Sequence, residues 1–254
     1  MGLRIAVAGK GGAGKTTVAA LLAGVLAREG RSVLLVDLDS DPNLAAALGV
    51  PAGQAVPLVH RTDLVTERTG STGEPGGMFV LNPRVSDIAE KYALKISDRV
   101  SLLPVGTIER AGEGCFCPQT AFVRALVKRL ILDEDESVVL DLEAGLESFG
   151  RSVVEGLDLL LVVVEPGMRS VDTARRIFGM APGLGIRSVR IVANKVRPDT
   201  LGPLRRLLSD EGLAIGPSLA WCEELSRRDL RGEPVLDWRD AIFEEEARAL
   251  IRGL

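Results

Sequence analysis

The chain has 254 residues, a hydrophobic content of 46% and a formal net charge of −4. This length and composition suffice for one large α/β domain with a full hydrophobic core. There is no broad basic excess to neutralise a nucleic-acid backbone and no apolar run of about twenty residues to cross a membrane. We therefore expect a cytoplasmic protein that binds neither nucleic acid nor membrane.

Short β-rich runs alternate with helical patterns along almost the whole chain. The predicted strands are Arg4–Ala8, Ser32–Asp37, Met78–Leu81, Ser101–Leu103, Ser137–Leu142, Leu159–Val164, Ser188–Ala193 and Ile215–Leu219. The clearest helical patterns are Thr16–Arg28, Gln119–Leu132, Thr200–Leu208 and Asp240–Leu254. Continuous apolar strands are typical of a parallel sheet that is covered on both faces. We predict a doubly wound α/β fold, with a mainly parallel central sheet flanked by helices, in a single domain spanning residues 1–254.

A phosphate-binding motif, GxxxxGK(S/T), lies between the first predicted strand and the first predicted helix. Its residues are Gly9, Lys10, Gly11, Gly12, Ala13, Gly14, Lys15, Thr16 and Thr17. The glycines let successive backbone N–H groups turn toward phosphate oxygens, and the helix adds the positive end of its dipole. Lys15 can hold the β- and γ-phosphates, and the Thr16 hydroxyl can bind Mg²⁺. The motif predicts a site for ATP or ADP with Mg²⁺.

Lys10 is a second lysine near the start of this loop. It resembles the signature lysine of the deviant Walker A ATPases, the class that contains the MinD, ParA and nitrogenase iron-protein families. In that class the lysine reaches across a dimer interface to the partner's nucleotide. The resemblance implies a homodimer that closes on ATP. The alternative is a lysine that only adds local positive potential.

Acidic residues follow the second predicted strand, where carboxylates at the end of a parallel strand point into the nucleotide crevice. One of them is expected to orient the attacking water. Spacing to Leu48-Gly49 matches Asp39 to the aspartate of the related ATPases, whereas the literal Asp-Pro pair is Asp41-Pro42. We favour Asp39 for this role and interpret Asp41 as a cap for a helix that starts near Asn43.

Two further segments resemble nucleotide-contacting parts of these ATPases. The apolar run that ends at Asp141 looks like a Walker B strand followed by a switch II segment. Asp141 would hold Mg²⁺ through water, and Gly145 would sense the γ-phosphate. Asn194 and Lys195 stand where related ATPases contact adenine, and an amide can both donate to and accept from a purine edge. A polar turn at the end of a strand is the alternative for this pair.

The chain has three cysteines, of which Cys115 and Cys117 share one loop and Cys222 is distant. Two thiols one residue apart can bind one soft cation, but a tetrahedral thiolate site needs four ligands. A second copy related by a two-fold axis would complete the set. Such a site favours Zn²⁺, Ni²⁺ or Cu(I) and could release its ion when the chains separate. Two unliganded cysteines and a redox dithiol are the alternatives.

The chain resembles the CooC-type accessory ATPases that serve nickel insertion into carbon monoxide dehydrogenase. The segments that carry the resemblance are Gly9–Thr17, Glu67–Gly70, Leu81–Val85, Cys115 with Cys117, Ala144-Gly145, Glu165-Pro166 and Asn194–Arg197. Two departures are Asp39-Ser40, where the family usually has Asp-Pro, and Ala220–Cys222, which replaces a segment that often begins with proline.

This resemblance implies a homodimer with slow, closure-coupled ATP hydrolysis, in which Lys10, Lys15 and Asp39 are the catalytic residues. It implies that nickel, or zinc, binds between the subunits at Cys115 and Cys117. The client would be the carbon monoxide dehydrogenase apoenzyme.

Two other functions remain open. A positioning ATPase of the MinD or ParA kind would need a basic amphipathic helix or a basic DNA-binding face, but the C-terminal pattern Asp240–Leu254 carries Glu244–Glu246. An iron-protein-like reductase would carry a 4Fe–4S cluster between subunits. The known reductases have one cluster ligand near switch II, and Leu142–Phe149 contains no cysteine.

Overall fold

The computed structural model describes residues 2–71, 77–106, 117–132, 136–143, 156–186, 188–213 and 215–254. In chain order the elements are β1 (Arg4–Gly9), α1 (Lys15–Arg28), β2 (Val33–Leu38), α2 (Leu44–Ala47), the 3₁₀ helix η1 (Leu58–His60), α3 (Thr62–Thr69), α4 (Ile88–Tyr92), β3 (Leu94–Lys95), β4 (Val100–Pro104), α5 (Pro118–Leu132), β5 (Ser137–Leu142), β6 (Leu159–Val164), α7 (Met168–Met180), the 3₁₀ helix η2 (Ala181–Leu184), β7 (Val189–Val196), α8 (Pro198–Asp210), β8 (Ile215–Ala220), α9 (Glu223–Arg231) and α10 (Ala241–Arg252).

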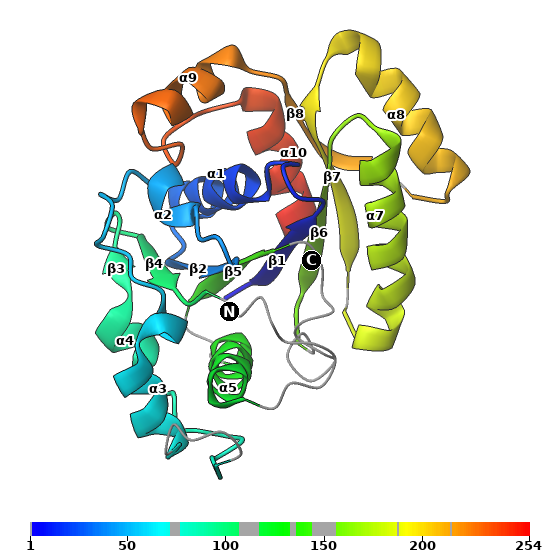
Figure 1. The fold of residues 1–254 in the computed structure, drawn as a ribbon. Coiled ribbons are helices and arrows are strands. Elements are labelled where there is room, and N and C mark those ends of the chain that lie inside the picture. The colour runs from blue at the N-terminus through cyan, green and yellow to red at the C-terminus, as the bar shows by residue number, and fades with distance from the viewer. Residues whose placement is uncertain are drawn as a thin grey trace.

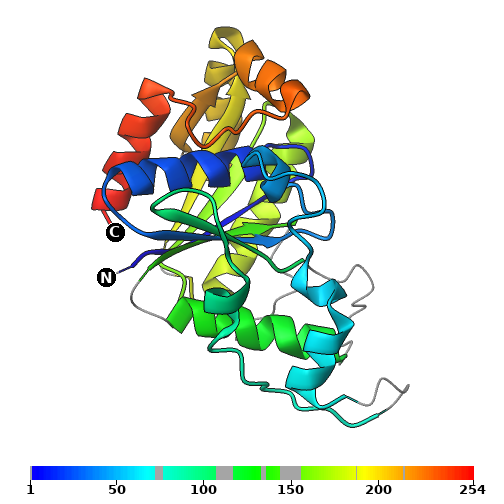
Figure 2. The ribbon, with the colours of Figure 1, turned by 90° about the vertical axis from the view of Figure 1, so that its left-hand side faces the viewer.

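The strands of this described part form one eight-stranded sheet in the order β3-β4-β2-β5-β1-β6-β7-β8. Every neighbouring pair is parallel except β3 and β4, which are antiparallel. Helices cover both faces, with α1 and α10 on one side and α3, α5, α7 and α8 on the other (Figures 1 and 2). This confirms the predicted doubly wound fold with a mainly parallel sheet.

The two hydrophobic cores follow from the alternation of side chains along each strand. In β1, Ile5 and Val7 pack with α1 and α10, whereas Ala6 and Ala8 pack on the opposite face. Because both faces are covered, both sets of side chains are buried, and the central strands read as continuous apolar runs.

The order of the strands brings several loops together at one edge of the sheet. β1 lies between β5 and β6, and β2 lies on the far side of β5. In register, Asp141 of β5 is beside Val7 of β1 and Asp37 of β2. Carboxyl ends of parallel strands meet at the same edge, so the ends of β1, β2, β5, β6 and β7 border one crevice.

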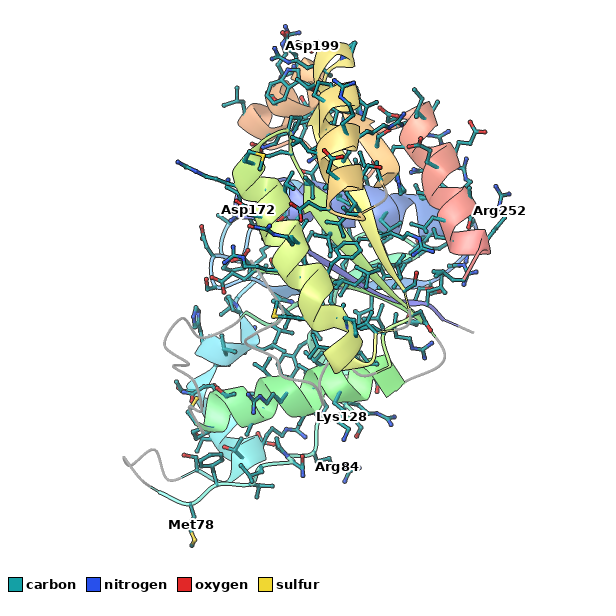
Figure 3. All side chains as sticks on the ribbon, turned by 90° about the vertical axis from the view of Figure 1, so that its right-hand side faces the viewer. Met78, Arg84, Lys128, Asp172, Asp199 and Arg252 are labelled. Carbon is teal, nitrogen blue, oxygen red and sulfur yellow. The ribbon has the colours of Figure 1, made fainter. Side chains whose placement is uncertain are left out.

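The predicted strand Met78–Leu81 is wrong. These residues form no strand, and Met78, Val80 and Leu81 are 90%, 52% and 56% exposed. Figure 3 shows Met78 projecting from the end of its loop. The edge position next to β4 is taken by the short antiparallel strand β3, so this apolar run has no strand to pair with. The other predicted strands and the four predicted helices are confirmed.

In the part of the chain that the structure describes, no helix is both long and apolar enough to cross a membrane.

Candidate functional site

The loop between β1 and α1 has the backbone of an anion-binding site. Gly9, at the end of β1, approaches β6 so closely that a Cβ there would lie 2.4 Å from the carbonyl oxygen of Val163. Gly14 precedes α1 with a φ of 92°, and α1 begins at Lys15 without a side-chain cap or an acidic residue in its first turn. The first N–H groups of the helix are therefore available to a ligand, at the positive end of the helix dipole.

Two side chains at the end of β7 hold this loop through hydrogen bonds. The Asn194 amide nitrogen donates to the carbonyl oxygen of Ala13 at 2.8 Å, and Lys195 Nζ donates to that of Gly12 at 2.5 Å. A register irregularity lies between Ala193 and Val196, and Lys195 has a φ of 55°. This bulge lets two consecutive side chains reach the same loop. Both residues thus lie at the predicted place, while their contact with adenine stays a prediction.

Glu165, which follows β6, connects the two lysines of the site. Its carboxylate oxygens lie 3.3 Å from Lys10 Nζ and 3.5 Å from Lys195 Nζ. Lys10 is therefore held within its own chain in this conformation. From the sequence, Glu165 stood out only as part of the family resemblance, and these contacts were not predicted. A reach of Lys10 to a partner's nucleotide stays a prediction.

Asp141 is a buried carboxyl group beside the phosphate loop. Both of its oxygens are buried and have no hydrogen-bond partner in the described part of the chain. Burial raises the pKa of Asp141 to about 7, and the charge of Asp37 adds to this, while the Thr16 hydroxyl and the Lys15 ammonium act in the opposite direction. A buried acid without partners, next to a hydroxyl, fits the water-mediated Mg²⁺ site that the sequence predicts.

Asp37 organises the loop after β2. Its carboxylate accepts hydrogen bonds from the backbone N–H groups of Asp39, at 3.1 Å, and Leu44, at 3.0 Å. Burial raises the pKa of Asp37 to about 6, against the effect of these two bonds. The prediction that Asp41 caps the following helix is wrong, because Asp41 is exposed and Asp37 holds the N–H group at the start of α2. Asp39 is half-buried, and its charge raises the pKa of Asp141.

These raised pKa values predict how the stability of the nucleotide-free chain depends on pH. The unfolded chain loses an aspartate proton at about pH 4, whereas folded Asp141 keeps it until about pH 7. The unfolded state therefore binds fewer protons between these values, and the free energy of unfolding should fall as the pH rises. Asp141→Asn removes this cost. The free energy of unfolding of the variant should therefore exceed that of the parent by about 1–3 kcal/mol at pH 8 and by less at pH 5.

Urea unfolding of both proteins at the two pH values, in the presence of a chelator, measures this difference. An equal gap at pH 5 and pH 8 would contradict the assigned ionisation of Asp141.

A pocket of about 430 Å³ leads away from the phosphate loop toward α9. Its walls come from the start of α1, the ends of β7 and β8, and α9. The lining residues are Gly14, Thr16, Thr17, Asn43, Ala47, Asn194, Lys195, Leu219, Ala220, Trp221, Cys222, Leu225, Ser226, Asp229 and Val235. This volume is typical of a small-molecule site. The phosphate end of this pocket and Asn194 were predictable from the sequence, whereas the part formed by α9 was not.

The predicted metal-binding residues are only partly described. Cys117 is half-buried directly before α5, with its Sγ 3.1 Å from Thr120 Oγ1. Cys115 lies outside the described residues, and so does Gly145. Among the described residues no group of three or more His, Cys, Asp or Glu side chains is arranged to hold a metal ion. Cys222 lies apart, at the wall of the pocket beside α9.

A glycine-rich loop between a buried parallel strand and an uncapped helix, next to a buried strand-end acid, defines a P-loop nucleotide-binding protein. Residues 5–235 match the family described as the CobQ/CobB/MinD/ParA nucleotide binding domain. The chain belongs to this family, and it is an ATP-binding P-loop protein of the ATPase class.

Two relatives are similar over most of the chain. The carbon monoxide dehydrogenase accessory protein CooC of Rhodospirillum rubrum is 45% identical over 197 residues, which cover 76% of this chain and 74% of the relative. An uncharacterized ATP-binding protein of Methanocaldococcus jannaschii is 41% identical over 235 residues, covering 92% of this chain and 91% of the relative.

Solved structures of the same fold come from cell-division proteins. The MinD cell division protein of Aquifex aeolicus superposes with a TM-score of 0.70 at 22% identity, covering 99% of this chain and 97% of that chain. The septum site-determining protein MinD of Pyrococcus horikoshii, in complex with Mg-ADP, gives 0.67 at 17% identity, covering 98% and 96%. At these identities the likeness shows the fold alone.

Proposed function

We propose that this protein is an ATP-dependent metallochaperone. It binds nickel at Cys115 and Cys117, shared across a homodimer, and assists maturation of the metal cluster of carbon monoxide dehydrogenase. The observation that carries the proposal is the 45% identity to a CooC accessory protein over 76% of the chain. The Cys-x-Cys pair adds the chemistry that delivery of a soft metal ion requires.

The nucleotide part of the proposal assigns a role to each polar group around the P-loop. Lys15 holds the β- and γ-phosphates, and Asp39 orients the attacking water. Thr16 and Asp141 hold Mg²⁺, Asp141 through water, and the bound ion neutralises charge on the phosphates. The buried, partnerless oxygens of Asp141 and the half-buried position of Asp39 support these assignments.

Lys10 links the nucleotide to pairing of the chains in this proposal. Its contact with Glu165 joins side chains that are 34% and 26% exposed. Ion pairs of such partly exposed groups contribute about 1 kcal/mol or less. The partner's nucleotide, with several phosphate charges, can therefore compete for Lys10 at small cost. ATP binding would then favour the closed dimer, in which Lys10 leaves Glu165 and crosses the interface.

The position of Cys117 at the start of α5 supports its part in the proposed metal site. The carbonyl oxygen of Cys117 accepts from the N–H group of Ala121, so Cys117 is fixed to the first turn of the helix. Phe122, one residue further, is fully buried in the core between α5 and the sheet. Cys117 is thus held at the start of a helix that is anchored in the core.

Titration of the metal-free protein with Ni²⁺, with no nucleotide, with ADP and with ATP, tests this function when the mass is measured in each state. We expect one nickel ion per two chains, and metal only in species with the mass of a dimer. Nickel binding to single chains would contradict metal delivery, and so would the absence of nickel binding in every nucleotide state. An ATP-dependent dimer without metal would instead favour a MinD- or ParA-like switch.

A further inference from the structure

An open hollow of about 490 Å³, called the α7 hollow below, lies along the exposed side of α7 next to the first lysine of the phosphate loop. Its lining residues are Lys10, Arg169, Asp172, Thr173, Arg175 and Arg176. Four of these side chains are cationic, one is acidic and none is apolar. This local excess of positive charge lies on a chain whose formal net charge is −4. The α7 hollow is therefore suited to an anionic ligand.

The spacing of the residues along α7 explains why they share one side of the helix. Thr173 and Arg176 follow Arg169 by four and seven residues, which places all three on one face. The opposite face, which includes Val171 and Ile177, is buried in the core. Seven residues span about 10 Å along a helix axis. The core packing of α7 thus fixes Arg169 and Arg176 at two separate points of the same surface.

Two of the four cations have acidic neighbours at the border of the α7 hollow. Arg175 pairs with Asp172 at 2.9 Å and with Glu211 at 3.5 Å. Lys10 contacts Glu165 at 3.3 Å. Figure 3 shows Asp172 on the side of α7 that faces away from the sheet. These acids offset only part of the positive charge.

The other two cations, Arg169 and Arg176, have no acidic partner in the part of the chain that the structure describes. Arg176 donates to the hydroxyl of Thr173 at 3.3 Å, which leaves its charge uncompensated. Exposure alone does not distinguish these arginines, because Arg205 and Arg206 on α8 are exposed as well. What distinguishes them is that they line one hollow together with two further cations.

We propose that the α7 hollow is a docking site for an acidic segment of a partner protein, whose carboxylates pair with Arg169 and Arg176. Guanidinium groups bind carboxylates through paired hydrogen bonds, and arginine clusters are a recurring means of recognising acidic motifs. A single small anion cannot reach both arginines. An extended segment rises about 3.3 Å per residue, so acids three residues apart match their separation. Because Lys10 belongs to both sites, the docked segment lies next to the nucleotide.

A nucleic acid fits this surface less well than an acidic segment does. Its affinity comes from neutralising many phosphates along a basic surface, whereas the positive charge here is confined to one hollow. The inference does not depend on metal delivery, because no residue of the α7 hollow belongs to the proposed nickel site.

Fluorescence anisotropy with two labelled peptides tests the proposal. Both consist of glycine and serine, with glutamate at every third position in one and glutamine at the same positions in the other. Saturating MgADP keeps the peptides away from the phosphate loop, and nickel is left out. The parent should bind the glutamate peptide about tenfold more tightly, as expected for two partly exposed ion pairs. Arg169→Gln with Arg176→Gln should bring this ratio close to one.

Arg205→Gln with Arg206→Gln is the matched control, because it removes the same charge from exposed residues that do not line the α7 hollow. It should keep the parent's ratio. An equal loss in both double variants would show general attraction to a positive surface and would overturn the proposal. Equal binding of the two peptides by the parent would do the same, and so would displacement of the glutamate peptide by a lower concentration of duplex DNA than of unlabelled peptide.

Discussion

Replacing Lys15 with alanine is expected to lower ATP turnover at least about 100-fold, the loss typical for one preorganised group that stabilises transition-state charge. Lys15 is the first residue of α1 and is only 7% exposed. It forms no ion pair within the described ranges, so its charge is available to the phosphates. Phosphate release at saturating MgATP measures the effect.

Lys128→Ala is a suitable control for the loss of a lysine. Lys128 is exposed on α5 and does not line the nucleotide pocket (Figure 3). Its replacement should leave turnover unchanged. Unchanged turnover in Lys15→Ala would remove the assignment of Gly9–Thr17 as the nucleotide site.

The double replacement Cys115→Ser with Cys117→Ser should reduce nickel binding to background. Loss of an outer-shell partner alone costs roughly 10–100-fold in metal affinity, and this variant removes the thiolates themselves. ATP affinity should stay close to that of the parent, because neither residue belongs to the P-loop motif and Cys117 is not among the described residues that line the pocket beside α9. Isothermal titration with Ni²⁺ and, separately, with ATP measures both quantities.

Cys222→Ser controls for the general loss of a thiol. Cys222 lines the nucleotide pocket and is not part of the Cys-x-Cys pair. It should therefore keep nickel binding at the level of the parent. If the double variant still bound one nickel ion per dimer, or if Cys222→Ser lost the metal, the binding site would be misplaced.

The fold was largely predictable because its signals are local and repeated. The run Leu159–Val164 is apolar at every position, which indicates a strand covered on both faces, and it forms the buried strand β6. The short run Met78–Leu81 gives a similar local signal but forms no strand. Whether such a run joins a sheet depends on the pairing and packing that it finds in the folded chain, and β3 occupies the edge next to β4.

The candidate site was likewise predictable only in part. Lys15 and Thr16 were predictable because a contiguous motif places them on one loop. The contact between Lys10 and Glu165 joins residues 155 positions apart, and no spacing rule says that these side chains meet. The signal that could have found it is the position of Glu165 directly after β6, the strand that pairs with β1.

The role of Asp37 was missed for a related reason. The sequence shows several acids after β2, but only the structure shows that Asp37 turns back to the N–H group of Leu44.

X-ray absorption of the nickel-loaded dimer counts the sulfur atoms bound to the metal and tests the account most directly. If each chain supplies half of a tetrahedral set through Cys115 and Cys117, the spectrum will show four sulfur neighbours around each ion, with one ion for every two chains. Two sulfur neighbours completed by nitrogen or oxygen, at one ion per chain, would contradict a metal site shared between the subunits.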